Sequence, residues 1–402
     1  MRRSLSVFLF LAASTASTAS AQIVSLGSAA GISAGTYLGT ATIDMSHPAN
    51  AAGQVTTAFV RGTSNGSCPG SIKLKVVRLD LGNGVFNVVA DRGPFTIVPG
   101  SNRLTLSPPI DVQAGDYIAT VVQPTSCVAV TAGHHRLGDF SLVTAGDFAS
   151  GRAISSFVMN REVRPIAQLT STDTLLAGVI PAVGATQGGF GSFFRTSVQF
   201  ANPTSSASSI RVVFHPIFAA AQANDPSRTF LVAPFTTQTH PDLITEMGLT
   251  GIGSMDVITT DGTPPAVTTR VFNDNGDAGT NGFYEDLVAP FDAMHSAESS
   301  SFTLPGDLDH FRVNAGVRTL SSTTLTISYY EPNGGTPIGA TLFKTYAANY
   351  FEQVPLSAFL NDQQLIAGGL LVIRVVTGDA VVYFSTTDNR TNDTAATILR
   401  SQ

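Results

Sequence analysis

The feature that most constrains the fold is an alternation of apolar and polar residues with a period of two. This pattern runs through residues 72–77, 117–122, 210–214, 325–330 and 380–384. Because successive side chains of a β-strand point to opposite faces, the alternation predicts strands with one buried face. Glycine-rich and asparagine-rich turns at 82–84 and 333–335 separate such segments. We therefore predict an all-β fold, interrupted by two short helical turns at 242–247 and 358–363.

A second pattern is an internal repeat with an offset of about 116 positions. The matching residues are Gly253 with Gly369, Val257 with Ile373, Asn273 with Asn389, and Asp277 with Asp393. Two Phe-Arg pairs, at 194–195 and 311–312, stand 117 positions apart. Each copy has the length of one two-sheet sandwich. We predict tandem Ig-like β-sandwich repeats at 173–295 and 296–402, preceded at 22–172 by an N-terminal jelly-roll-like sandwich.

The first 21 residues have the three parts of a secretory signal peptide. Arg2 and Arg3 give a cationic start, residues 5–13 are apolar, and residues 19–21 read Ala-Ser-Ala, a cleavage motif. After residue 22, no uninterrupted apolar run approaches the roughly 18 residues that a membrane helix needs. We therefore expect a protein without a membrane span that works outside the cytoplasm, either secreted to the extracellular space or periplasmic.

The chain has two cysteines, Cys68 and Cys127, both in its first third. Export would place them in an oxidising compartment, where pairing is the expected state. A disulfide between them would stabilise the folded state by about 4 kcal/mol on the chain-entropy account. We predict that this disulfide closes the N-terminal domain.

Charge excludes one large class of partner. Lys and Arg number 22 against 28 Asp and Glu, and the lysines are only Lys73, Lys75 and Lys344. Such an acidic chain has no basic stripe for a phosphate backbone, so we expect no binding to nucleic acid.

The candidate metal ligands lie in an acidic, glycine-rich loop at 273–282 and just after it. Asp274, Asp277, Asn281 and Glu285 place four oxygen-bearing side chains on one stretch, and calcium prefers several oxygen ligands on a flexible turn. The loop does not follow the twelve-residue pattern of an EF-hand. Asn, Asp and Gly are also the residues that a hairpin loop requires. A plain hairpin is the favoured interpretation and a calcium site is the alternative; we expect no other cofactor.

No motif predicts catalysis. The segment 31–35 reads G-x-S-x-G but lacks the following helix of a nucleophile elbow. The seven histidines form no H-E-x-x-H pattern. Asp307, Asp309 and His310 form an acid and base cluster that the other repeat does not preserve. The chain has no Trp, so an aromatic platform for sugar stacking is only weakly indicated.

Short motifs add a resemblance. Residues from about 179 to the end resemble a duplicated β-sandwich module of secreted bacterial proteins, through Phe194-Arg195-Thr196, Asn202-Pro203, Phe272-Asn273 and Phe311-Arg312. Residues 22–172 similarly resemble bacterial extracellular jelly rolls, through 74–78 and 114–118. That module has no established activity, so the resemblance implies a fold and no chemistry.

The function predicted from the sequence is therefore that of a non-catalytic cell-surface, matrix or adhesion module, whose exposed loops bind a protein or a polysaccharide. The alternative is a carbohydrate-binding protein that uses its N-terminal domain, with or without calcium. A hydrolase with carboxylates from separate strands is the least favoured interpretation.

Overall fold

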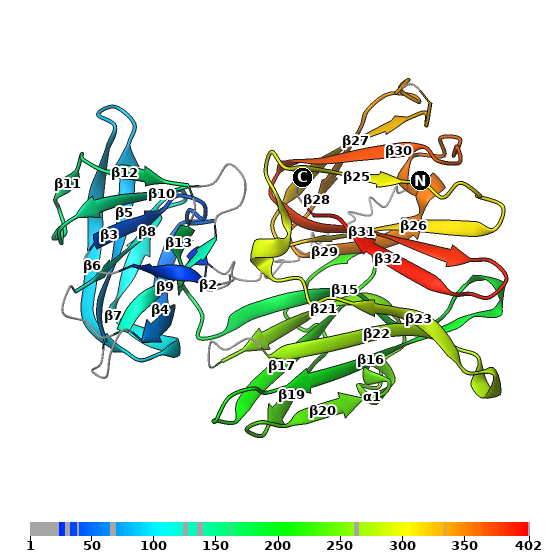
Figure 1. Cartoon of the computed structure of the whole chain (residues 1–402), viewed down its shortest axis with the longest axis horizontal. Coiled ribbons are helices and arrows are strands. Elements are labelled where there is room, and N and C mark those ends of the chain that lie inside the picture. Colours follow the sequence, from blue (N-terminus) through cyan, green and yellow to red (C-terminus); the bar gives the residue numbers. More distant parts are fainter. Residues whose placement is uncertain are drawn as a thin grey trace, which may run out of the picture.

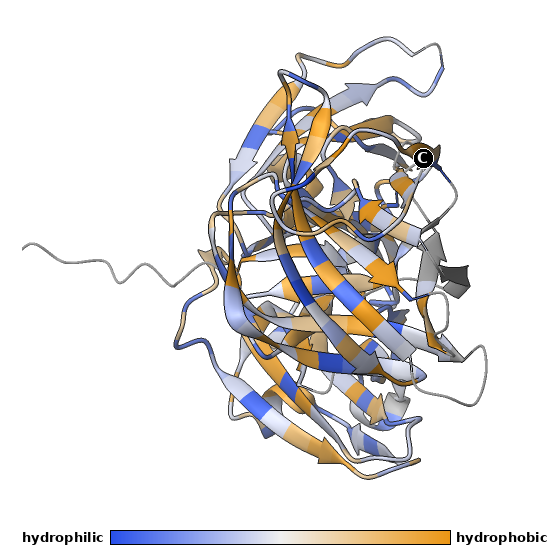
Figure 2. Cartoon of the chain, turned by 90° about the vertical axis from the view of Figure 1, so that its left-hand side faces the viewer, coloured by the Kyte–Doolittle hydropathy of each residue, from blue (hydrophilic) through white to orange (hydrophobic). Residues whose placement is uncertain are grey.

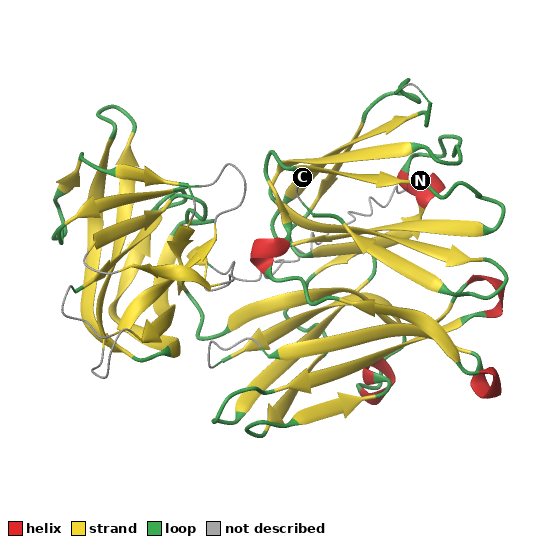
Figure 3. Cartoon of the chain, viewed as in Figure 1, coloured by secondary structure: helices red, strands yellow, loops and turns green. Residues whose placement is uncertain are grey.

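The computed structural model describes residues 24–28, 33–37, 40–64, 70–123, 128–134, 140–161, 163–260, 265–333 and 335–400. The all-β prediction is confirmed, because these residues form antiparallel strands with only two four-residue α-helices and three 3-10 turns (Figure 3). Orange and blue residues alternate along the strands in Figure 2, which is the period-two pattern of the sequence placed on the fold.

Residues 25–170 form two seven-stranded sheets (Figure 1). The first sheet contains β1 (Ser25–Ser28), β2 (Ser33–Tyr37), β4 (Gly53–Ser64), β7 (Gly100–Val112), β9 (Val128–His134), β13 (Val163–Pro165) and β14 (Ala167–Thr170). The second contains β3 (Thr40–Asp44), β5 (Gly70–Asp80), β6 (Val85–Ile97), β8 (Tyr117–Val122), β10 (Ser141–Ala145), β11 (Ala153–Ile154) and β12 (Val158–Asn160). Buried aliphatic side chains of both sheets, among them Val60, Leu74 and Ile118, pack together as the core.

The next unit, which we call the first module, is built on one eight-stranded sheet that folds over itself. Its elements are β15 (Leu175–Gln187), η1 (Gly189–Gly191), β16 (Phe193–Ala201), β17 (Ser208–Pro216), β19 (Ser227–Val232), β20 (Thr237–His240), α1 (Leu243–Glu246), β21 (Gly251–Thr259), β22 (Ala266–Asp274), η2 (Gly276–Ala278), β23 (Thr280–Glu285) and η3 (Pro290–Asp292). Helix α1 lies within the helical turn predicted at 242–247, and Asp242 caps it by accepting a hydrogen bond from the Thr245 amide.

The last unit, the second module, has sheets of six and four strands. Its elements are β24 (Met294–His295), β25 (Ser299–Thr303), β26 (Phe311–Thr319), β27 (Thr323–Tyr330), β28 (Leu342–Tyr346), β29 (Tyr350–Pro355), α2 (Leu356–Phe359), β30 (Leu370–Thr377), β31 (Asp379–Asp388) and β32 (Thr394–Ile398). Helix α2 begins two residues before the predicted turn at 358–363.

The pairing of strands repeats between the two modules. In the first, β16 pairs with β20 and β22, β17 with β19 and β21, β15 with β21, and β22 with β23. In the second, β26 pairs with β29 and β31, β27 with β28 and β30, β25 with β30, and β31 with β32. The same pairings in the same chain order support the internal duplication read from the sequence.

The two modules share a sheet. Strand β18 (Ala219–Ala220), which leaves the first module after β17, pairs with β29 of the second module. Buried side chains also cross between the modules, where Ala182 of β15 packs with Phe351 and Tyr383. In Figure 1 the two modules lie against each other, while the N-terminal sandwich stands beside them.

Two further predictions concern membrane spans and the two cysteines. No helix among the described residues is long and apolar enough to cross a membrane. Cys68 and Cys127 lie outside the described residues, as do the signal peptide and the segment 29–32 within which Gly31 falls. The described strand ends that lead toward the two cysteines are neighbours, because Ser64 of β4 pairs with Val128 of β9.

Candidate functional site

The structure does not gather the four predicted calcium ligands. Asp274 ends β22, Asp277 is exposed on η2, and Asn281 and Glu285 lie on β23. In the β22–β23 ladder Asp274 pairs with Thr280, whereas Glu285 pairs with Thr269, five steps further along. At the rise of a β-strand this separates Glu285 from Asp274 by about 17 Å. No group of three or more His, Cys, Asp or Glu side chains in the described part of the chain could hold a metal ion.

Asp274 already has partners. One carboxylate oxygen accepts a hydrogen bond from the Gly276 amide at 3.1 Å, and the other lies 2.9 Å from Arg195 Nε. These contacts hold the pKa of Asp274 below its usual range. The guanidinium of Arg195 also pairs with Asp242, so one arginine ties the hairpin to the N-terminus of α1. These contacts anchor the β22–β23 hairpin, so the role of Asp274 is structural.

Glu285 faces the interior instead of the loop. Its side chain is only 3% exposed, and both carboxylate oxygens accept from the Ala182 amide, at 3.2 and 3.3 Å. Burial raises its pKa well above the ordinary value and so disfavours the charged form. A neutral carboxyl is a poor calcium ligand.

Asn281 joins the two loops that the sequence singled out. Its side-chain amide donates to the Thr391 carbonyl of the second module at 2.6 Å. Asp388, at the start of that second loop, accepts from the Arg390 and Thr391 amides. The loop at 273–282 and its repeat at 388–393 therefore contact each other, and their polar groups serve this contact.

Five histidines of the described residues lie within ion-pair distance of a carboxylate. His215 is buried, with Nδ1 2.6 Å from Asp225 and Nε2 3.0 Å from Asp256. Arg318 of the second module, fully buried, donates to Asp256 at 2.7 Å. The four side chains form a charged network across the module interface. Burial alone would raise the pKa of Asp256, but Arg318 and then His215 outweigh it and lower this pKa to about 2.

The cluster at 307–310 is local. Asp307 accepts from the backbone amides of Asp309 and His310 and pairs with the His310 ring, all within one exposed turn. These contacts hold the pKa of Asp307 below its usual range. Among the described residues, Asp307 and His310 have no other ionisable partner. The cluster therefore stabilises a turn of the chain.

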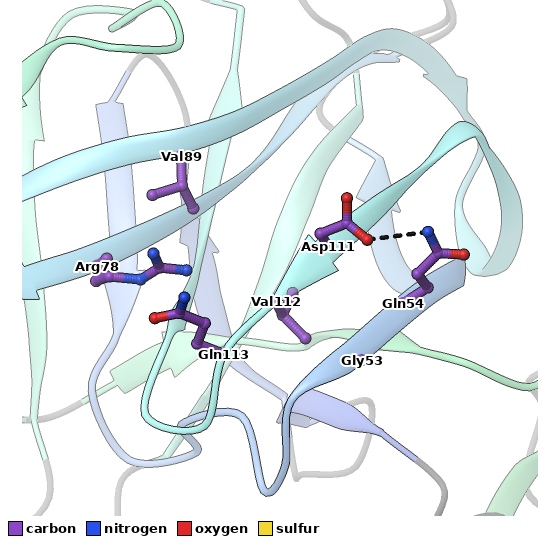
Figure 4. A pocket seen from close by; sticks show the side chains of 7 residues that line it. All are labelled: Gly53, Gln54, Arg78, Val89, Asp111, Val112 and Gln113. Carbon is purple, nitrogen blue, oxygen red and sulfur yellow. Dashed lines mark hydrogen bonds between the residues drawn. The ribbon is translucent and has the colours of Figure 1, made fainter.

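An open groove lies on the N-terminal sandwich. It encloses about 460 Å³, and the residues that line it come from β4, β5, β6 and the end of β7 (Figure 4): Gly53, Gln54, Arg78, Val89, Asp111, Val112 and Gln113. Gln54 donates to Asp111 at 2.9 Å. Arg78 is held by two hydrogen bonds to the buried Asp116, at 2.7 and 2.8 Å. The groove therefore presents fixed polar side chains beside two valines.

A second cavity lies between the modules and encloses about 350 Å³. We call it the intermodule cleft. The first module contributes mainly apolar residues: Ala182, Val183, Gly184, Thr186, Gln187, Gly188, Gly189, Phe194, Ile252, Val271 and Phe283. The second module contributes only polar ones: Arg312, Asn314, Gln353, Tyr383, Ser385, Thr387 and Thr394. The cleft therefore has one apolar wall and one polar wall.

Sequence reasoning named Arg312 within a repeat motif but did not find the cleft or the charged network. The members of each come from distant strands. One signal was present, because Arg312, Asn314 and Arg318 alternate with the core residues of β26 and so mark its second face as polar. No protein-family profile matches the chain, and no curated protein matches it significantly. The assignment of function therefore rests on geometry.

Proposed function

We propose that the protein acts outside the cytoplasm as a non-catalytic interaction protein of the cell surface or matrix. The observation that carries this proposal is that buried charges and a shared strand pairing join the two modules. The network of Asp225, His215, Asp256 and Arg318 crosses the module interface, and the modules share the β18–β29 pairing. Both features favour a rigid base that presents the N-terminal sandwich to a partner.

The test is a pull-down of the full mature chain on whole cells and on insoluble polysaccharides, with a panel of chromogenic esters and glycosides in parallel. We expect retention on cells or on a polymer without turnover. Turnover that disappears when one carboxylate is replaced would overturn the non-catalytic proposal.

A second candidate is carbohydrate binding through the N-terminal groove. Gln54, Arg78, Asp111 and Gln113 are planar polar side chains that suit pairs of sugar hydroxyls, and Arg78 is held in place by Asp116. Asp111→Ala removes one acceptor, whose side-chain partner among the described residues is Gln54. We expect this variant to lose retention on polysaccharide while a Leu81→Ala variant, at a turn position that is 88% exposed, keeps it. Equal retention of both variants would exclude the groove.

A further inference from the structure

The intermodule cleft contains a cation, Arg312, that forms no ion pair with a described residue. Arg312 Nη1 and Nη2 donate to Asn389 Oδ1 at 3.1 Å and Asn392 Oδ1 at 2.9 Å, both neutral amides. Among the described residues, no carboxylate lies within ion-pair distance of Arg312. Asp388 acts on Arg312 electrostatically, but only its backbone carbonyl accepts from Arg312, at 3.4 Å. The Asp388 carboxylate accepts from the amides of its own loop. Burial lowers the pKa of the Arg312 guanidinium, which shows the cost of this placement.

The first module has an equivalent arginine, Arg195, whose charge is neutralised by carboxylates. Arg195 opposes Phe272 in β22, and Arg312 opposes Thr387 in β31, so the two arginines occupy equivalent places in the duplicated sheet. Two positions after these partners stand Asp274 in the first copy and Asn389 in the second. The ladders therefore match Asn389 to Asp274, which corrects by one residue the match to Asn273 read from the sequence. Arg195 pairs with Asp274, whereas Arg312 meets an asparagine.

The other acid is also replaced. Arg195 pairs with Asp242, the N-cap of α1, and the N-cap of α2 is Pro355. The second copy therefore keeps the arginine and lacks both of its carboxylates. This leaves one positive charge facing a cavity.

The chain at residues 189–190 lies close to the Arg312 guanidinium. Gly189 lies beside the guanidinium, since a Cβ there would stand 3.8 Å from Arg312 Nε. The Phe190 ring lies 5.2 Å from the guanidinium carbon, at a positive φ of 56° that a non-glycine residue rarely adopts. The Phe190 carbonyl accepts a hydrogen bond from the Asn392 side chain at 3.1 Å. The arginine is thereby held in one place at the cleft.

The rest of the lining defines what an anion bound here would carry. Beyond Arg312 the polar wall offers amides and hydroxyls, including Asn314, Gln353 and Ser385. The opposite wall includes the aromatic rings of Phe194 and Phe283. A polyhydroxylated ring has hydroxyls at its edge and apolar C–H groups on its faces, so it matches two walls of this kind. These polar side chains already bond to one another, as Asn314 does to Ser385, and an aliphatic acid would cover them without adding hydrogen bonds.

We propose that the intermodule cleft binds an acidic sugar of the hexuronate class, with the sugar carboxylate on Arg312 and its hydroxyls on the polar wall of the second module. This site goes beyond the proposed function, because it lies outside the N-terminal groove and does not depend on it.

The test is calorimetric titration of the full mature chain with glucuronate, glucose, cyclohexanecarboxylate and inorganic sulfate. We expect saturable binding of glucuronate, with the three other probes at least about tenfold weaker. Absence of glucuronate binding would overturn the proposal. Sulfate or cyclohexanecarboxylate binding as tightly as glucuronate would also overturn it, in favour of a general anion site or an apolar-acid site.

Two variants test the role of the arginine. Arg312→Gln should weaken glucuronate binding about ten- to a hundredfold, the worth of charge-assisted hydrogen bonds. Asn389→Asp keeps the arginine but restores the carboxylate of the first copy, and it should weaken binding by a similar factor. Arg195→Gln, the matched change in the first copy, should leave affinity unchanged. Thermal unfolding confirms that each variant is folded. A folded Asn389→Asp variant with unchanged affinity would contradict the proposal, and cell retention that persists in all variants would leave the proposed function intact.

Discussion

Replacing Arg318 with methionine tests whether the buried charges hold the two modules together. Arg318 is fully buried on β26 and donates to Asp256 of β21 at 2.7 Å. The variant removes the only cation among the described residues that pairs with Asp256 besides His215. Removing one partner of a buried ion pair costs about 3–5 kcal/mol, because the other charge stays buried. For a unit of this size we expect Tm to fall by about 6–20 °C in calorimetry.

The same network predicts a dependence on pH. The pKa of Asp256 is about 2 in the folded protein, below the ordinary value of 3.8. The lowered pKa contributes stability that is fully present above pH 3.8 and is lost as pH falls toward 2. This contribution is about 2 kcal/mol. In Arg318→Met that acid-dependent loss should shrink.

The matched control is Arg195→Met, which removes an arginine whose ion pairs are partly exposed. Such pairs contribute about 1 kcal/mol or less. If Arg318→Met lowers Tm no more than Arg195→Met does, the buried network does not stabilise the joined modules and the reasoning fails.

Three further tests, two with variants and one with the unchanged protein, have defined outcomes. Gly316→Ala should destabilise the protein by about 1–3 kcal/mol in urea unfolding, because the added Cβ would lie 2.1 Å from the Tyr383 ring; an unchanged midpoint would show that the ring moves freely. Glu285 has a raised pKa, so stability should decline as pH rises above 4.5, and Glu285→Gln should remove that decline in melts from pH 5 to 8; a decline that persists would assign it to another group. For Cys68 and Cys127, we expect intact-mass spectrometry of the exported protein to find no free thiol, and alkylation of both without reductant would contradict the disulfide.

The alternation of side chains predicted most of the fold because it is a local property. The strands around residues 72–77, 117–122 and 325–330 lie where the sequence places them, since one buried face is enough to define a strand. The duplication was also readable, because residues such as Val257 and Ile373 occupy equivalent core positions in both copies. Long-range pairing, such as β18 with β29, leaves no local pattern.

The site was predicted less well, for the same reason. The sequence places Glu285 just after the loop at 273–282, as a candidate ligand, yet it continues the inward phase of β23 and reaches the interior. The charged network joins residues as far apart as His215 and Arg318, and no spacing rule connects them. Sequence spacing finds ligands that share one loop or one strand, whereas this protein assembles its polar groups between two modules.

The strand that the first module lends to the second has a consequence for biogenesis. A chain is made from its N-terminus, so Ala219 and Ala220 leave the ribosome about 130 residues before their partners Tyr350 and Phe351. Until then the newly made copy carries an unpaired backbone edge and an uncovered Ala182, features that invite self-association. The second module therefore covers surfaces that the first module alone would expose. A truncation that stops between the two modules should yield aggregates instead of a smaller soluble domain.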